Sequence, residues 1–137
     1  MRFETEQDLI REKKAIELFV SIFNGSYQKL DPNDIDFKVF DEKKELVAYA
    51  EVKGRIRPMS KAYPLPLSAK KLIKLVDKRI RPMIIWCCED GIIYGRATEL
   101  YGEVRFGGRP AREGSFNDDE IMAYYNKQKS LKYIRFN

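Results

Sequence analysis

The sequence predicts a single small α/β domain, with helices packed on a central sheet. Two segments, 6–24 and 68–80, carry apolar residues at helical spacing. Shorter runs that are rich in β-branched and aromatic residues indicate strands; these runs are 35–41, 45–53, 82–88 and 92–98. A chain of 137 residues with 44% hydrophobic residues is long enough for one buried core. Because helices and strands both recur along the chain, layers of helix and sheet are expected.

The first predicted helix, 6–24, contains an acid within its apolar stripe. The apolar side chains that recur at helical spacing are Leu9, Ile16, Phe19, Val20 and Phe23. Glu12 lies three residues after the first of them and four before the second. A carboxylate on that face loses its hydration unless it has a partner. Glu12 is therefore a candidate functional acid. The alternative is a boundary residue that reaches solvent and pairs with Lys13 or another lysine.

The strands 35–41 and 45–53 are expected to form an antiparallel hairpin across a short polar connection. Side chains alternate along a strand, so Glu51 and Lys53 share one face of the second strand. The hairpin would bring Asp36 close to them. Two neighbouring carboxylates repel each other unless a cation intervenes, and Mg²⁺ prefers such oxygen ligands. A lysine at the same place could orient or deprotonate a water. The alternative is a surface hairpin with ordinary salt bridges.

Strong positive charge begins at Lys53. Residues 53–82 contain ten lysines or arginines and one acid, a net charge of +9, whereas the rest of the chain carries −4. A clustered basic surface is typical of proteins that bind polyanions. Next to a candidate metal site it favours nucleic acid, although a solvated helix face with linker charges would have the same composition. Three prolines predict an extended basic loop over 54–67.

The second helix and the strands after it have clear boundaries. Ser68 is a good N-cap for the helix 68–80. A continuous apolar run then ends in Cys87 and Cys88, which indicates a buried central strand with both thiols in the core. Two such cysteines indicate a reducing, intracellular location such as the cytoplasm. Glu89-Asp90-Gly91 predicts a hairpin turn.

The last part of the chain is less regular. Residues 107–116 are expected to form a flexible basic loop, and the segment from Glu120 onward either a strand or a short helix. Its aromatic residues are expected at the core edge rather than in a dimer face; they are Tyr124, Tyr125, Tyr133 and Phe136. The chain contains no histidine, which excludes histidine-dependent nucleases and serine–histidine hydrolases. No apolar run approaches membrane-spanning length, so no membrane partner is expected.

Several short motifs follow one another along the chain: Asp8-Leu9-Ile10-Arg11-Glu12, Ile35-Asp36-Phe37, Glu51-Val52-Lys53-Gly54-Arg55, Tyr63-Pro64, Ser68-Ala69-Lys70-Lys71 and Gly107-Gly108-Arg109. Their order resembles the PD-(D/E)xK nuclease superfamily, most closely its small phage-encoded members. The resemblance covers roughly residues 5–110. The proline before the first acid is displaced, since Pro32 lies four residues before Asp36, and this leaves Asp34 as a weaker rival.

The resemblance implies a restriction-endonuclease-like fold: a mixed central sheet flanked by helices, in one domain with its core at about 5–100 and a tail over 101–137. It also implies a DNA-cleaving enzyme, an endonuclease or resolvase-like nuclease that uses Mg²⁺ or Mn²⁺. Asp36, Glu51 and the Val52 carbonyl would ligate the metal. Lys53 would position the attacking water, and Glu12 would either orient a metal-bound water or join the metal shell.

The basic residues are expected to contact DNA, and the resemblance implies that Lys71 or Lys70 reaches the scissile phosphate. The predicted contacts are Arg55, Arg57, Lys61, Ser68, Lys70, Lys71, Lys74 and Arg109. A homodimer is compatible with this function, since two copies often cut two strands. The alternative is a non-catalytic nucleic-acid-binding domain with the same fold and basic face.

Overall fold

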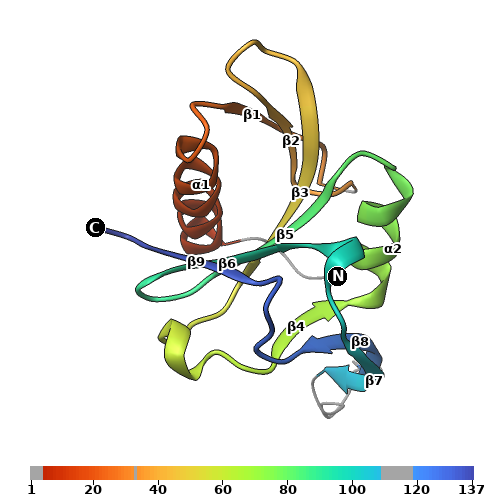
Figure 1. The fold of residues 1–137 in the computed structure, drawn as a ribbon. Coiled ribbons are helices and arrows are strands. Elements are labelled where there is room, and N and C mark those ends of the chain that lie inside the picture. Colours follow the sequence, from red (N-terminus) through yellow and green to blue (C-terminus); the bar gives the residue numbers. More distant parts are fainter. Residues whose placement is uncertain (1–4, 33, 109–118) are drawn as a thin grey trace.

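A six-stranded sheet forms the centre of the computed structural model, which describes residues 5–32, 34–108 and 119–137 (Figure 1). Its strands, in spatial order, are β1 (Ser26–Lys29), β2 (Phe37–Phe40), β3 (Leu46–Gly54), β5 (Pro82–Cys87), β6 (Gly91–Arg96) and β9 (Lys132–Arg135). The β3–β5 pair is parallel and the other pairs are antiparallel. The sheet is therefore mixed, which confirms the predicted α/β class.

The two faces of this sheet are covered differently. Helix α1 (Glu6–Ser21) packs on one face. The other face carries α2 (Ala69–Asp77) and a second, antiparallel sheet (Figure 1). The strands of that smaller sheet are β4 (Leu65–Ser68), β8 (Asp119–Tyr125) and β7 (Glu103–Gly108), in this order. Short 3₁₀ turns, η1 (Met59–Lys61) and η2 (Ala97–Glu99), connect these elements.

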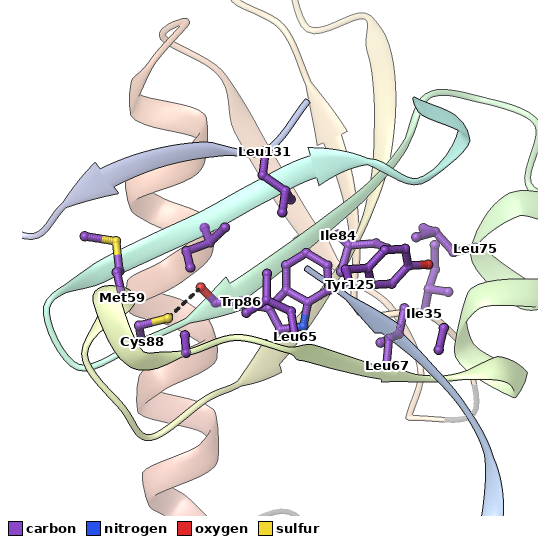
Figure 2. Close-up of a cluster of buried hydrophobic side chains, with 13 residues drawn as sticks. Ile35, Met59, Leu65, Leu67, Leu75, Ile84, Trp86, Cys88, Tyr125 and Leu131 are labelled. Atoms are coloured by element: carbon purple, nitrogen blue, oxygen red, sulfur yellow. Dashed lines mark hydrogen bonds between the residues drawn. The ribbon is translucent and has the colours of Figure 1, made fainter. Parts of the chain in front are cut away.

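Strand β5 is buried on both faces, as its continuous apolar sequence predicts. Met83, Ile85 and Cys87 belong to the cluster beneath α1, whereas Ile84, Trp86 and Cys88 belong to the opposite cluster. Figure 2 shows the second cluster on the side of the sheet away from α1, with the Trp86 indole at its centre. The prediction that both thiols are core residues is confirmed, because both cysteines are free and buried.

The predicted hairpin is confirmed, with Phe37 opposite Ala50 in the β2–β3 register. Helix α1 ends at Ser21 rather than at residue 24. Asn24 has a positive φ of 54°, and the Gly25 N–H donates a hydrogen bond to the Val20 carbonyl, which terminates the helix. Strand β1 was not predicted. It is a short polar segment at the sheet edge, where an apolar alternation is not required.

The prediction that 54–67 forms an extended loop is wrong in part, because this segment contains η1 and β4. Leu65 and Leu67 alternate with Pro66, and both leucines are fully buried. Proline is tolerated because β4 is an edge strand, where the missing N–H is not needed. The Pro66 carbonyl accepts a hydrogen bond of 2.8 Å from the Trp86 indole, which joins the two sheets.

The residues after 100 complete both sheets, since β7 and β8 belong to the smaller sheet and β9 to the larger one. The segment from Glu120 is thus a strand rather than a helix. Tyr125 lies in the core, 5.6 Å from Trp86 between ring centroids, as predicted, whereas Tyr133 is 41% exposed. Gly107 and Gly108 end β7 rather than opening a loop, and the rest of the predicted loop, 109–116, lies outside the described residues.

Neither α1 nor α2, the helices of the described part of the chain, is long and apolar enough to cross a membrane.

Candidate metal and nucleic-acid site

An open cleft of about 710 Å³ lies among α1, the C-terminal end of β3 and the N-terminal end of α2. It is lined by the acids and the lysine that the sequence singles out, which are Glu12, Asp36, Glu51 and Lys53. These residues come from α1, β3 and the entrance to β2, so the fold brings together side chains that are far apart in the chain. Val52 also lines this cleft.

Asp36 lies immediately before β2 and contacts the neighbouring strand through its side chain. Its carboxylate Oδ2 accepts a hydrogen bond of 2.8 Å from the Val52 N–H. The β2–β3 ladder ends at the Phe37–Ala50 pair, so this bond replaces a backbone partner. The N–H and C=O of one strand residue point to the same side. The Val52 carbonyl therefore faces the side on which the Asp36 carboxylate lies.

Glu51 is the most unusual group in the cleft. The residue is only 5% exposed, and its Oε1 has no hydrogen-bond partner among the described residues. Burial, followed by the negative charge of Asp36, raises the pKa of Glu51 to about 9. The ammonium of Lys71 opposes this effect from 4.0 Å, measured from Nζ to Oε2. A buried carboxylate oxygen without a donor is costly, and a bound cation would remove that cost.

Glu12 is buried on α1, as its place in the apolar stripe predicts, and is 8% exposed. It forms an ion pair with Lys29 of β1, which is the pairing with another lysine that the alternative for Glu12 describes. The charge of Glu12 also raises the pKa of Glu51, so the two carboxylates interact across the cleft.

A basic wall faces the acids. Lys70, Lys71 and Lys74 of α2 line the cleft together with Lys53, which is half-buried at the end of β3. Ser68 begins α2, and its hydroxyl accepts a hydrogen bond of 3.2 Å from the Lys71 N–H. This cap is the one that the sequence predicts, and it places the lysine-rich first turn of α2 at the cleft.

Ser68→Ala is expected to lower the free energy of unfolding by about 1 kcal/mol, because the first turn of α2 loses a partner for one backbone N–H. Chemical denaturation of the two proteins measures this difference. Ser60→Ala is the matched control, since Ser60 is an exposed serine in η1. An equal loss in both variants would contradict the capping role.

Three other predicted DNA contacts, Arg55, Arg57 and Lys61, do not line the cleft. The Arg55 guanidinium donates to the carbonyls of Ala62 (2.9 Å) and Pro64 (3.3 Å), so it holds the loop after β3. Arg57 and Lys61 are exposed and do not line the cleft. Arg109 lies outside the described residues.

Asp34, the alternative to Asp36 as the first metal-ligating acid, interacts with other residues. Its carboxylate accepts hydrogen bonds from the Ile35 N–H at 2.7 Å and from Lys78 Nζ at 2.9 Å. Hydrogen bonding from Lys78 is the largest cause that lowers the pKa of Asp34. Asp34 does not line the cleft. Asp36 is therefore the acid that the fold presents beside Glu51.

Three charged cleft residues, Asp8, Arg11 and Glu120, were not among the predicted site residues. Asp8 and Arg11, which are 3.3 Å apart between Oδ1 and a guanidinium nitrogen, lie on the same side of α1 as Glu12. Glu120 of β8 contributes a further acid from the distant end of the chain. Helical spacing from Glu12 could have indicated Asp8, but nothing local indicates Glu120.

Two carboxylates and a backbone carbonyl are a donor set that suits Mg²⁺, which keeps several waters and needs few protein ligands. Over the described ranges, no three Asp, Glu, Cys or His side chains are grouped as a complete metal cluster. The fit of this site to Mg²⁺ therefore rests on Asp36, Glu51 and the Val52 carbonyl, and above all on the unpartnered Oε1 of Glu51. Comparisons of the chain with protein families, with curated proteins and with solved structures give no match.

Proposed function

We propose that this protein is a Mg²⁺-dependent deoxyribonuclease of the PD-(D/E)xK superfamily, with a restriction-endonuclease-like fold. The observation that carries the proposal is Glu51, a buried carboxylate with an unpartnered oxygen beside Asp36. The lysines of α2 face this pair across an open cleft. A hard cation would neutralise the two acids, and the basic wall would attract a phosphate backbone.

The arrangement of elements supports the superfamily assignment. In the resemblance drawn from sequence, a glutamate lies on the first helix, an aspartate opens one strand, and Glu-x-Lys lies on the next. Here Glu12 lies on α1, Asp36 precedes β2, and Glu51 and Lys53 lie on β3. All four residues line one cleft.

The bound metal would supply a Lewis acid that stabilises the charge developing on the phosphate. Asp36, Glu51 and the Val52 carbonyl would hold it. Lys53 shares its strand face with Glu51, and its Nζ would donate a hydrogen bond to the water that attacks phosphorus as the P–O bond to the leaving group breaks. Lys71, whose ammonium lies 4.0 Å from Glu51, would pair with the phosphate.

A non-catalytic DNA-binding domain is the second candidate. It is favoured by the lack of a complete three-acid cluster in the part of the chain that the structure describes. Such a domain would keep the basic wall of α2 and bind DNA equally well in a chelator. The two functions therefore differ in their response to divalent metal.

Cleavage of labelled DNA in a metal panel tests the proposal. Duplex, single-stranded, flap and four-way-junction substrates are incubated with Mg²⁺, Mn²⁺, Ca²⁺ or EDTA. Cleavage of at least one substrate is expected with Mg²⁺ and Mn²⁺, and none with EDTA. If no substrate is cut with any metal while DNA binding is unaffected by EDTA, the binding-domain alternative holds.

A further inference from the structure

Lys29 lies beside the cleft acids through backbone pairing that the sequence does not indicate. Its strand β1 pairs with β2 so that Lys29 is opposite Phe37, the residue after Asp36. The next backbone bond, from the Leu30 N–H to the Asp36 carbonyl, is 2.8 Å long. The backbone of Lys29 is thus anchored next to the strand entrance that carries Asp36.

The ammonium of Lys29 reaches across to α1 and forms an ion pair with Oε1 of Glu12. The Glu12 side chain is 10% exposed in this pair and that of Lys29 is 41% exposed, so the carboxylate is desolvated and the lysine can still reach water. A desolvated carboxylate interacts strongly with a cation that contacts it. Glu12 therefore already has a positive charge at one oxygen.

The cleft acids consequently divide into two groups. Asp36 and Glu51 lie side by side, because the Asp36 carboxylate accepts a hydrogen bond from the N–H of Val52, the residue after Glu51. Glu12 is outside that pair, since no three acids of the described residues are grouped as a metal cluster. Asp36 and Glu51 are thus the two acids that would bind a divalent ion, whereas at Glu12 a lysine supplies the positive charge.

We propose that the cleft binds a single divalent ion at Asp36 and Glu51, and that Lys29 takes the place of a second ion at Glu12. This inference rests on the proposed metal-dependent function and goes beyond it, since it specifies the metal stoichiometry and a role for Lys29. Lys29 is then a positioning residue, which holds the Glu12 carboxylate and keeps it outside the metal shell. Two divalent ions together with this ammonium would place excess positive charge among three carboxylates.

Removal of the Lys29 charge is expected to open a second metal site. In Lys29→Met, the buried Glu12 carboxylate loses the ammonium and can share a divalent ion with the neighbouring acids. Calorimetric titration with Mn²⁺, in the absence of DNA, counts the bound ions for the full-length protein. Manganese electron paramagnetic resonance measures the same stoichiometry independently of activity.

The expected stoichiometry is one Mn²⁺ per chain for wild type and two for Lys29→Met. Lys29→Arg, which keeps the charge, and Lys43→Met, which removes an exposed lysine from the β2–β3 turn, should each bind one. The double variant Lys29→Met/Glu12→Gln should return to one, because the second site needs the Glu12 carboxylate. Circular dichroism checks that each variant is folded.

Two ions on wild type, or one ion on folded Lys29→Met, would overturn the inference and leave the nuclease proposal intact if cleavage still requires metal. No ion on wild type, together with no cleavage in the metal panel, would overturn both. If Lys29→Met does not fold, the wild-type stoichiometry and Lys29→Gln decide the question.

Discussion

Glu51→Gln is expected to abolish metal-dependent DNA cleavage and, at the same time, to make the metal-free protein more stable. Cleavage should fall by at least about 10³-fold, because the amide cannot replace the carboxylate as a metal ligand. Stability should rise because the buried carboxylate of Glu51 costs free energy whenever it is ionised beside Asp36. Catalytic and structural effects of one substitution therefore have opposite signs.

The stability difference should depend on pH with a defined sign. The pKa of Glu51 is about 9 in the folded protein, against an ordinary value of 4.5. The folded state thus binds this proton more tightly, and the stability it contributes is fully present below pH 4.5 and is lost as pH rises through about 9. Glutamine does not titrate. In EDTA the advantage of Glu51→Gln should therefore grow from near zero at pH 4.5 to about 5 kcal/mol at pH 8.5, because each pH unit in this range contributes about 1.4 kcal/mol.

Urea denaturation in EDTA at several pH values between 4.5 and 8.5 measures this advantage. Glu42→Gln is the matched control, because Glu42-Lys43-Lys44 has the same Glu-x-Lys spacing but lies in the exposed β2–β3 turn. Added Mg²⁺ should stabilise wild type by mass action and leave Glu51→Gln unchanged. Retained cleavage in Glu51→Gln, or an advantage that does not vary with pH, would contradict the assigned role.

Lys53→Met is expected to reduce the rate of DNA cleavage by about 10²- to 10³-fold without loss of metal binding. The methionine keeps the length and the apolar stem of the side chain but removes the ammonium from the face that Glu51 shares. Because a positive charge near two carboxylates is lost, Mn²⁺ should bind as tightly as in wild type or more tightly. The loss should therefore appear in kcat rather than in metal affinity.

Single-turnover cleavage in Mg²⁺ and calorimetric titration with Mn²⁺ separate these two quantities for Lys53→Met. Lys43→Met, in the β2–β3 turn, controls for the loss of one positive charge. If both lysine variants lose cleavage equally, general electrostatic attraction of DNA would explain the effect. If Lys53→Met no longer binds Mn²⁺, Lys53 would instead have a structural role at the site.

Local patterns in the sequence were sufficient to predict the helices and strands that surround the candidate site. Period-two alternation placed Glu51 and Lys53 on one face of β3, and helical spacing identified Glu12 as a buried acid on α1. Ser68 marked the start of α2, and the continuous apolar run marked β5 as a central strand. Each of these features depends on residues within one or two turns or strand repeats of each other.

Contacts between segments that are distant in the chain could be identified only from the folded structure. The short strands β1, β4 and β9 lie at sheet edges, so their pairing depends on partners elsewhere in the chain and leaves little local pattern. The ion pair between Lys29 and Glu12 likewise arises because β1 returns alongside β2 beneath α1.

Residue type and spacing thus predicted which acids and lysines could form a site, because hydrophobic periodicity and local charge depend on residues that are close in the chain. Which charges meet was decided by tertiary packing. Arg55 donates a hydrogen bond to a loop carbonyl, Asp34 accepts one from Lys78, and Lys71 forms an ion pair with Glu51. These choices depend on sheet register and on the position of α2, and both are set by the burial of side chains far apart in the chain.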